Sequence, residues 1–445
     1  MKAVIMAGGK GTRLRPICES EPKPMTRLLG RPLLEHIIEL LRRNGFKELC
    51  ITLAHQPKCI MDYFGSGERF GVSIEYRVED TPLGTAGGVA ACADFVGNED
   101  FLVISGDAAC DFDLLRLARE HKAHGGLVTM ALYPHSEPLR YGTVITNNGG
   151  TVISFIEKPC WERVVTDLVN TGVYMLSPEV LQAVPQGAVF DFAKDLFPAL
   201  TEEGAIFGVP IEGYWCDIGD GGSYLRCCMD ALSGALRLPL TPPPDSVPRI
   251  FDFAGDAPLI AGSMICDDVN IGPGAIIERS VIHSGSSIGA YCHITDSVID
   301  SAELGEGCCI SGSVICRGTM LPAETRTVPG DIISASLIPE RCKPVTPAAA
   351  VKRHGRGLCR ELSCRDRAAL MRHLSSALWE AGADFTDGIT LADGRCRVHI
   401  SPVADDSAIT VEAIGGREKE RLAICDKYSS LAEEFGAETA FVDIH

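Results

Sequence analysis

The sequence predicts an α/β domain with a mostly parallel sheet, followed by a left-handed β-helix and a small α+β domain. Three observations indicate this order. Short apolar runs alternate with amphipathic stretches over residues 1–235, a short repeat occupies residues 255–338, and longer strand and helix patterns return over residues 358–445. The chain has 445 residues, which exceeds the roughly 250–300 residues that one hydrophobic core supports.

The first domain, residues 1–235, begins with an apolar run at residues 3–7 that predicts a buried strand. Apolar residues at helical spacing predict a helix over residues 33–43, which ends at Asn44-Gly45. Residues 49–53 and 101–104 are further strand-like runs. Strands that alternate with helices predict a mostly parallel sheet.

A Pro-rich linker, residues 236–254, separates this domain from the repeat. Triplets of Ser, an apolar residue and Ile begin at residues 263, 280, 297 and 313. Ile-Gly or Leu-Gly pairs at 271, 288 and 304 follow the same spacing. This period predicts the coils of a triangular β-helix, with aliphatic residues inside the prism and Gly permitting the turn at its corners. Such coils stack, so we expect a homo-oligomer that assembles through the β-helix.

Two histidines of the repeat, His283 and His293, would be candidate bases if the β-helix were an acyltransferase. We favour the simpler interpretation that both are ordinary solvent-facing side chains. After a second linker, residues 339–357, the last domain has a predicted helix over 365–383. Strands are predicted around 387–389, 397–400 and 408–411, and a final helix over 418–435.

Charge and cysteine content narrow the possible partners. The net charge of −18 argues against general nucleic-acid or anionic-membrane binding, although a local basic site could still bind a small anion. The 19 cysteines form no CxxC pair, and neither a secretory start nor a membrane-spanning apolar run is visible. We therefore expect reduced thiols and a cytoplasmic protein.

A Gly-rich, basic loop follows the first predicted strand. Its sequence, GGKGTRLRP, places backbone N–H groups at a strand end, where an anion can approach closely. Residues 1–27 contain six basic and two acidic residues, so positive charge is concentrated there. The loop matches neither the GxxxxGK[ST] nor the GxGxxG pattern.

The GGKGTRLRP run, followed by PKPM at residues 22–25, resembles the signature of sugar-phosphate nucleotidylyltransferases, also called NDP-sugar pyrophosphorylases. Similar motifs follow in order: PLGTAG (82–87), SGD (105–107), EKP (157–159), NTGVY (170–174) and WCDIG (215–219). The resemblance covers the first domain and implies a Rossmann-like nucleotidyltransferase fold. It implies transfer of a nucleoside monophosphate from an NTP to a hexose 1-phosphate, with release of pyrophosphate.

Within this family the chain is most similar to bacterial mannose-1-phosphate guanylyltransferases, which would make GTP and mannose 1-phosphate its substrates. Glucose-1-phosphate uridylyl or thymidylyl transfer is the near alternative. A non-catalytic regulatory subunit that binds a sugar nucleotide is the alternative of another class. Retention of Arg13, Lys23, Asp107 and Asp217 favours catalysis.

The resemblance also implies a role for individual residues. Arg13 would hold the β- and γ-phosphates, and Lys23 would contact the α-phosphate. Asp107 follows the strand predicted over 101–104 and Asp217 follows Trp215, and two carboxylates brought together at strand ends are typical of a Mg²⁺ site. Asp113 is expected to cap a helix instead. The residues expected to bind the nucleotide are Ala7, Gly8, Gly9, Gly11, Thr12, Glu79, Gly84 and Thr85, and those expected to bind the sugar phosphate are Gly142, Glu157, Lys158 and Asn170.

The last domain resembles the C-terminal domain of phosphohexomutases, on the runs at 387–389, 393–394, 397–402 and 409–413. That family grips phosphate with an RPSGTEP loop. Here the corresponding residues 401–407 read SPVADDS, which has lost phosphate donors and gained two acids. We therefore exclude mutase activity and expect an accessory module.

Overall fold

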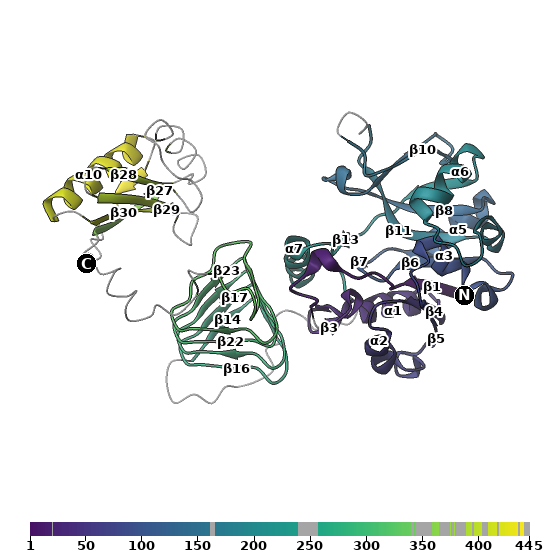
Figure 1. Cartoon of the computed structure of the whole chain (residues 1–445), viewed down its shortest axis with the longest axis horizontal. Coiled ribbons are helices and arrows are strands. Elements are labelled where there is room, and N and C mark those ends of the chain that lie inside the picture. The colour runs from purple at the N-terminus through teal and green to yellow at the C-terminus, as the bar shows by residue number, and fades with distance from the viewer. Residues whose placement is uncertain are drawn as a thin grey trace. The chain divides into compact units, whose positions relative to one another are not determined.

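The computed structural model describes residues 1–19, 21–160, 165–238, 257–339, 342, 358–364, 374, 378, 389–393, 396–402, 408–415, 418–434 and 437–439. It divides into two compact units, Met1–Lys343 and Pro344–His445. The helix expected over 365–383 and the loop 403–407 lie largely or wholly outside the described residues. Figure 1 shows the elements of both units.

A mixed sheet lies at the centre of the first unit, with strand order β10-β9-β11-β6-β1-β4-β5. Its strands, with β8 and β12 joined beside β11, are β1 (Lys2–Met6), β4 (Glu48–Leu53), β5 (Ser73–Val78), β6 (Phe101–Ser105), β8 (Val128–Pro134), β9 (Gly142–Thr146), β10 (Val152–Glu157), β11 (Leu168–Leu176) and β12 (Ile206–Pro210). Strand β1 runs parallel to β4 and β6, and β4 runs parallel to β5. The predicted α/β sheet is confirmed, and β11 joins it antiparallel to β6.

Helices cover both faces of this sheet because successive residues of a strand point to opposite sides. Ala3 and Ile5 pack in one apolar cluster with α1 and α2, whereas Val4 packs in another with α3 and α6. The helices are α1 (Leu33–Arg43), α2 (Pro57–Phe64), α3 (Gly84–Ala90), α4 (Ala93–Val96), α5 (Leu114–His124), α6 (Phe197–Glu202) and α7 (Gly221–Ser233). Asp113 caps α5 as expected, because its carboxylate accepts the N–H of Arg116 at 2.9 Å.

Short elements connect these layers. The short helical segments are η1 (Thr12–Leu14), η2 (Lys23–Met25), η3 (Glu68–Phe70), η4 (Pro138–Arg140), η6 (Pro178–Ala183) and η7 (Phe192–Leu196). Two small ribbons are β2 (Arg27–Leu28) with β3 (Arg31–Pro32), and β7 (Ala108–Cys110) with β13 (Trp215–Asp217).

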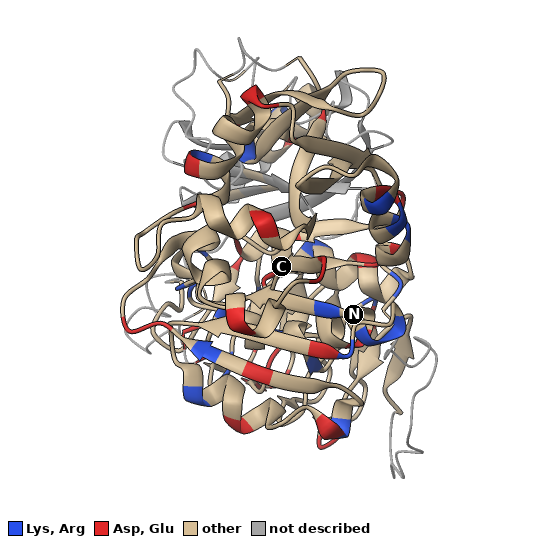
Figure 2. Cartoon of the chain, turned by 90° about the vertical axis from the view of Figure 1, so that its right-hand side faces the viewer, with Lys and Arg blue, Asp and Glu red and all other residues tan. Residues whose placement is uncertain are grey.

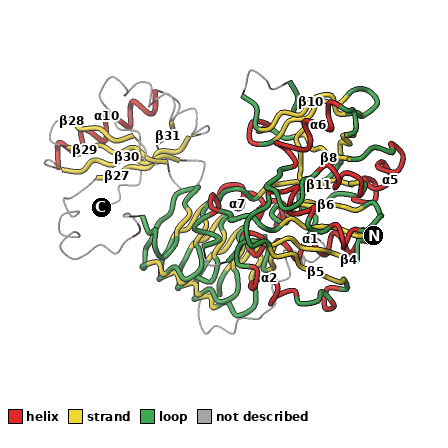
Figure 3. The backbone as a smooth tube through the Cα atoms, turned by 45° about the vertical axis from the view of Figure 1, so that its right-hand side comes forward, coloured by secondary structure: helices red, strands yellow, loops and turns green. Residues whose placement is uncertain are grey.

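The repeat forms three parallel sheets of stacked short strands, as the period predicts (Figure 3). They are β14 (Leu259–Ala261), β17 (Ile276–Glu278), β20 (His293–Thr295) and β23 (Cys309–Ser311); β15 (Met264–Ile265), β18 (Val281–Ile282), β21 (Val298–Ile299), β24 (Val314–Ile315) and β26 (Ile332–Ile333); and β16 (Asn270–Ile271), β19 (Ser287–Ile288), β22 (Glu303–Leu304) and β25 (Met320–Leu321). The Ile residues of the triplets fill the prism and are fully buried at Ile282, Ile299 and Ile315.

The serine of each triplet has a specific task. The hydroxyl oxygen of Ser263 accepts the N–H of Ser280 at 3.0 Å, and Ser280 and Ser297 accept the N–H of the next serine at 3.1 Å. Each hydroxyl also donates to the carbonyl two residues earlier in the chain. This ladder satisfies buried donors between coils, which explains why serine recurs.

The corner glycines are needed for a different reason than the predicted one. A Cβ on Gly272, Gly289 or Gly305 would lie 2.5, 2.6 or 2.4 Å from backbone atoms of the next coil. None of the three has a left-handed backbone conformation. Glycine is therefore required because stacked corners approach too closely for any side chain, and not because the turn needs positive φ.

One sheet of the β-helix turns an apolar face toward the α/β domain. Its outward residues Val281, Val298 and Val314 are at most 2% exposed and belong to the cluster around α1 and α7. The expectation that His283 faces solvent is wrong, because it is fully buried, and burial lowers its pKa to about 4. His293 on β20 is exposed, as expected.

The second unit contains an antiparallel sheet with order β28-β29-β30-β27-β31 and helix α10 (Glu418–Glu434), which contacts β30 and β27. Its strands are β27 (Leu358–Cys364), β28 (Ile389–Asp393), β29 (Cys396–Pro402), β30 (Ala408–Gly415) and β31 (Ala437–Thr439). Strands β29 and β30 and helix α10 fall where the sequence pattern placed them, β28 overlaps the predicted strand only at Ile389, and β27 and β31 were not predicted.

The distribution of charged residues and the free cysteines agree with the expectations from composition. On the side that Figure 2 presents, Lys and Arg are interspersed with Asp and Glu. Every cysteine between residues 18 and 316 is a free thiol. Among the residues that the structure describes, no helix has the length and apolar character needed to cross a membrane.

Candidate active site

Two carboxylates meet where β6 ends. Asp107 follows β6 after one turn residue and directly precedes β7. Strand β13 pairs antiparallel with β7 so that Asp217 lies opposite Ala108. This register, together with the turn after β6, places Asp217 beside Asp107 although 110 residues (217 − 107) separate them in sequence.

The ammonium group of Lys23 lies between these carboxylates. Its Nζ is 2.7 Å from Oδ2 of Asp107 and 3.0 Å from Oδ1 of Asp217. Burial opposes the charge of Lys23, but attraction to and hydrogen bonds with the two carboxylates outweigh it and raise its pKa. Burial similarly opposes the charge of Asp107, yet Lys23 and a 2.5 Å hydrogen bond from Ser105 lower its pKa. Lys23 and Asp107 are therefore charged together at neutral pH.

The local sequence explains how Lys23 reaches this position. Pro22 and Pro24 flank it, and η2 begins at Lys23 itself. The Gly-rich loop closes over it, because a Cβ on Gly11 would lie 2.9 Å from Cβ of Lys23. Gly11 also has φ of 60°, a conformation that favours glycine. At the tip of the loop Gly9 is exposed, with nothing within 4 Å of where a Cβ would lie.

Arg13 lies beside the carboxylates. It belongs to η1 and is exposed. Its Nη2 is 3.6 Å from where a Cβ on Gly219 would lie, and that position is 3.2 Å from Oδ2 of Asp217. Arg13, Asp107 and Asp217 line the same cleft, whose volume is about 290 Å³. The cleft thus combines the guanidinium of Arg13 with the carboxylate pair.

The four residues expected to bind the sugar phosphate line the cleft as well. Glu157 at the end of β10 pairs with Gly142 at the start of β9. A Cβ on Gly142 would lie 2.8 Å from Oε2 of Glu157, so glycine gives this carboxylate its room. Burial raises the pKa of Glu157, and Lys158, 4.0 Å away, opposes that rise. Asn170 accepts the hydroxyl of Tyr174 at 2.9 Å, which fixes its side-chain oxygen.

The residues expected to bind the nucleotide divide into two groups. Thr85 lines the cleft and donates a 3.0 Å hydrogen bond to Asp191. Gly84 packs against Phe190, whose carbonyl oxygen lies 2.5 Å from the position of a Cβ. Glu79 accepts the N–H of Leu83 at 2.9 Å.

The remaining predicted nucleotide residues follow β1. Ala7 is buried, Gly8 is half-buried beside Ala54, and Thr12 is exposed in η1. These residues lie directly after β1 and in the Gly-rich loop, and they are not among the residues that line the cleft.

Sequence reasoning missed several residues that line the cleft. Arg140 forms an ion pair with Asp220 at the N-terminus of α7, and Tyr141 follows it. Asp191 caps η7 and contacts Thr85. Arg140 and Tyr141 directly precede Gly142, and this position next to an expected sugar-phosphate residue was the signal that could have found them. Asp191 shows no such signal, because its pattern is that of an ordinary cap.

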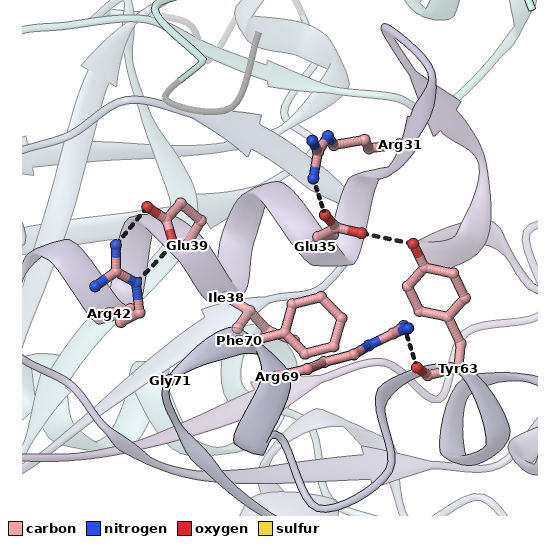
Figure 4. A pocket seen from close by; sticks show the side chains of 9 residues that line it. All are labelled: Arg31, Glu35, Ile38, Glu39, Arg42, Tyr63, Arg69, Phe70 and Gly71. Carbon is pink, nitrogen blue, oxygen red and sulfur yellow. Dashed lines mark hydrogen bonds and ion pairs between the residues drawn. The ribbon is translucent and has the colours of Figure 1, made fainter. Parts of the chain in front are cut away.

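One larger cavity elsewhere is less suited to chemistry. It has a volume of about 590 Å³ and lies between α1 and η3 (Figure 4). Glu35 there binds Arg31 and the hydroxyl of Tyr63, both at 2.6 Å. Arg69 stacks on the Tyr63 and Phe70 rings at 4.6 and 4.5 Å. Its charged groups thus already bind one another.

Comparisons with known proteins agree with this geometry. A family model described as nucleotidyl transferase matches residues 2–234, and a second, described as the GlmU-like C-terminal hexapeptide, matches residues 249–331. The chain belongs to the nucleotidyl transferase family. The resemblance noted in the sequence is thereby confirmed for the α/β domain and the β-helix.

Relatives of this nucleotidyl transferase have related names. A UTP–glucose-1-phosphate uridylyltransferase of Synechocystis sp. is 33% identical over 337 residues, covering 67% of this chain and 87% of the relative. A mannose-1-phosphate guanylyltransferase of Mycobacterium tuberculosis is 33% identical over 297 residues, covering 66% and 82%. Mannose-1-phosphate guanylyltransferase 1 of Arabidopsis thaliana is 30% identical over 348 residues, covering 76% and 92%.

Proposed function

We propose that this nucleotidyl transferase moves a guanylyl group from GTP to mannose 1-phosphate, giving GDP-mannose and pyrophosphate. One observation carries the proposal: a single cleft is lined at one side by Asp107 and Asp217, which bind the buried Lys23, and at the other by Glu157 and Lys158. The names of the Mycobacterium and Arabidopsis relatives support mannose 1-phosphate and guanylyl transfer.

In the proposed reaction, an oxygen of the sugar phosphate forms a bond to the α-phosphorus of the nucleotide. The bond from that phosphorus to the bridging oxygen breaks, and its electron pair leaves with pyrophosphate. Two anions must approach, so positioning and charge neutralisation are the main tasks of the protein. Lys23 would neutralise the α-phosphate, and Arg13 the leaving pyrophosphate. A preorganised donor of this kind contributes about 3–4 kcal/mol to the transition state.

We assign Mg²⁺ to Asp107 and Asp217. In the described part of the chain, no group of three or more His, Cys, Asp or Glu side chains is arranged to hold a metal ion. The pair nevertheless suits Mg²⁺, which is usually bound through one or two carboxylates, with phosphate oxygens and water completing its octahedron. A bound Mg²⁺ would neutralise phosphate charge. Removing divalent cations with EDTA is expected to abolish turnover, which a pyrophosphate-release assay would show.

The sugar 1-phosphate would be bound by side chains that still have hydrogen-bonding capacity. Glu157 can accept two sugar hydroxyls, and the half-exposed ammonium of Lys158 can reach the sugar phosphate. The oxygen of Asn170 is occupied by Tyr174 and by the N–H of Gly172, so its NH₂ group is the donor offered to the ligand.

Uridylyl transfer to glucose 1-phosphate is the second candidate, because the Synechocystis relative bears that name at similar identity. A matrix of GTP, UTP, dTTP, ATP and CTP against mannose and glucose 1-phosphates, followed by pyrophosphate release, distinguishes the two. The highest kcat/KM should belong to GTP with mannose 1-phosphate. Turnover of UTP with glucose 1-phosphate alone would establish the alternative. No turnover with any pair would favour the non-catalytic regulatory subunit.

We also propose a cytoplasmic homo-oligomer. The free thiols between residues 18 and 316 suit a reducing compartment. Among the described residues, the end strands β14 and β25 each pair with a strand on one side only, and an unpaired edge favours association with another copy. Light scattering coupled to gel filtration would measure the mass in solution.

A further inference from the structure

The outward face of the sheet β15-β18-β21-β24-β26 touches the segments that carry catalytic side chains. Ile332 on β26 contacts Gly221, where a Cβ would lie only 1.8 Å from the Ile332 side chain. Gly221 begins α7, four residues after Asp217. On the same face Cys266 lies 3.0 Å from where a Cβ on Gly30 would be, in the turn between β2 and β3.

Ion pairs hold the segment that carries Lys23 on both of its sides. Nη1 of Arg317, two residues after β24, is 2.5 Å from Oε1 of Glu21. Oδ1 of Asp300, which directly follows β21, is 3.5 Å from Nη1 of Arg27. Arg317 and Asp300 are also 3.8 Å apart and thus form one charge network. The network connects two coils of the β-helix to positions just before and just after Lys23.

The backbone between these ion pairs and Lys23 is conformationally restricted. Lys23 lies between Pro22 and Pro24, whose rings fix φ on both sides. The hydroxyl of Tyr224 donates to the carbonyl of Arg27 at 2.8 Å and fixes the other end. We therefore expect a displacement at Glu21 to shift the backbone of Lys23, because the one residue between them is a proline with a fixed φ.

We propose that Arg317 and Asp300 are positioning residues for Lys23, so that the β-helix sets where the ammonium lies between Asp107 and Asp217. The effect on turnover rests on the proposed function, whereas the effect on Lys23 itself does not. Loss of either residue releases one side of the segment. Misplacement by about 1 Å can cost as much as 100-fold in rate, so we expect kcat to fall about ten-fold for each single loss.

The test compares Arg317→Met and Asp300→Asn with Arg279→Met. Arg279 makes two 2.8 Å hydrogen bonds to Asp296 on an exposed part of the same β-helix, so its loss controls for breaking an ion pair there. Lys23 in the folded, full-length protein is acetylated with sulfosuccinimidyl acetate, and its modification rate is followed by peptide mass spectrometry. kcat and KM are measured in parallel, with circular dichroism confirming that each variant is folded.

We expect acetylation of Lys23 to accelerate about five-fold or more in Arg317→Met and Asp300→Asn, because the amine leaves its two carboxylates more often. KM should change less than kcat, and Arg317→Lys, which keeps the charge, should restore both readouts. Unchanged Lys23 acetylation in both variants would overturn the proposal, whatever the turnover. Equal effects in Arg279→Met would overturn it too. Faster acetylation with normal kcat would refute the catalytic consequence.

Lack of turnover in the wild-type protein would instead refute the proposed function. The acetylation rates would then still decide whether the β-helix positions Lys23.

Discussion

Replacing Lys23 by Met tests the charge balance of the site, because Met keeps the length of the side chain and removes its charge. Each ion pair amounts to roughly 4 kcal/mol of Coulomb energy at an effective dielectric constant of about 20. Desolvation of the buried ammonium offsets much of this attraction, and deleting one partner of a buried pair costs about 3–5 kcal/mol. Asp107 and Asp217 are 34% and 23% exposed.

Because water screens these partly exposed carboxylates, we expect the unfolding free energy to fall by less, roughly 2 kcal/mol. The same substitution should strengthen Mg²⁺ binding, since no ammonium then competes for the pair. A ten-fold lower Kd for Mg²⁺ would add about 1.4 kcal/mol to the unfolding free energy of Lys23→Met at saturating Mg²⁺. Turnover should nevertheless fall at least about 100-fold, because the α-phosphate loses its cation.

Thermal unfolding with and without Mg²⁺, together with calorimetric titration of Mg²⁺, measures both effects. Lys10→Met is the matched control, because Lys10 is exposed on the same Gly-rich loop. Mg²⁺ should raise the melting temperature of Lys23→Met more than that of the wild type or of Lys10→Met. The reasoning is refuted if Lys23→Met is as stable as the wild type and responds equally to Mg²⁺.

Three further changes have expected outcomes. Arg13→Ala should lower kcat about 100-fold with the unfolding free energy unchanged, because Arg13 is exposed, and normal kinetics would contradict its role. His283 has a pKa of about 4 in the folded protein against 6.5 ordinarily, mainly through burial. Stability should therefore fall as pH drops through that window, by up to about 3 kcal/mol, and His283→Leu should remove this slope in denaturant titrations at several pH values. Deleting residues 344–445 should leave the melting transition and activity of the first unit intact, because that segment forms a separate unit; an inactive but folded truncation would make the tail essential.

The α/β sheet and the β-helix could be predicted because each depends on a local period. Strand-and-helix alternation gave β1, α1, β4 and β6, and the Ser-apolar-Ile repeat gave the coils. The carboxylate pair could be anticipated from the SGD and WCDIG motifs, which contain the two aspartates. The hydrogen bonds of Lys23 could not be anticipated, because its partners lie 84 and 194 residues away, at distances set only by the register of β7 and β13.

The error at His283 has the same physical origin. An isolated β-helix alternates inward and outward residues, so a residue just after a strand can be assigned to solvent with good reason. The docked α/β domain removes that solvent, and no local pattern around His283 reports it. Asp191 was missed for a related reason, since its role in the cleft follows from contact with Thr85, 106 residues away in sequence.

One signal for the docked face was nevertheless present in the repeat. The outward positions of one sheet are Asn270, Ser287, Glu303 and Met320, whereas those of another are Met264, Val281, Val298, Val314 and Ile332. A face of the β-helix in contact with water would not be expected to have an apolar residue at the same position of five successive strands, because exposing apolar surface costs free energy. The triplet therefore encodes two contacts at once: Ile fills the prism and Val meets the α/β domain. Charged residues that follow such triplets, Asp300 and Arg317, then lie at the edge of that contact, which is where they can act on the segment that carries Lys23.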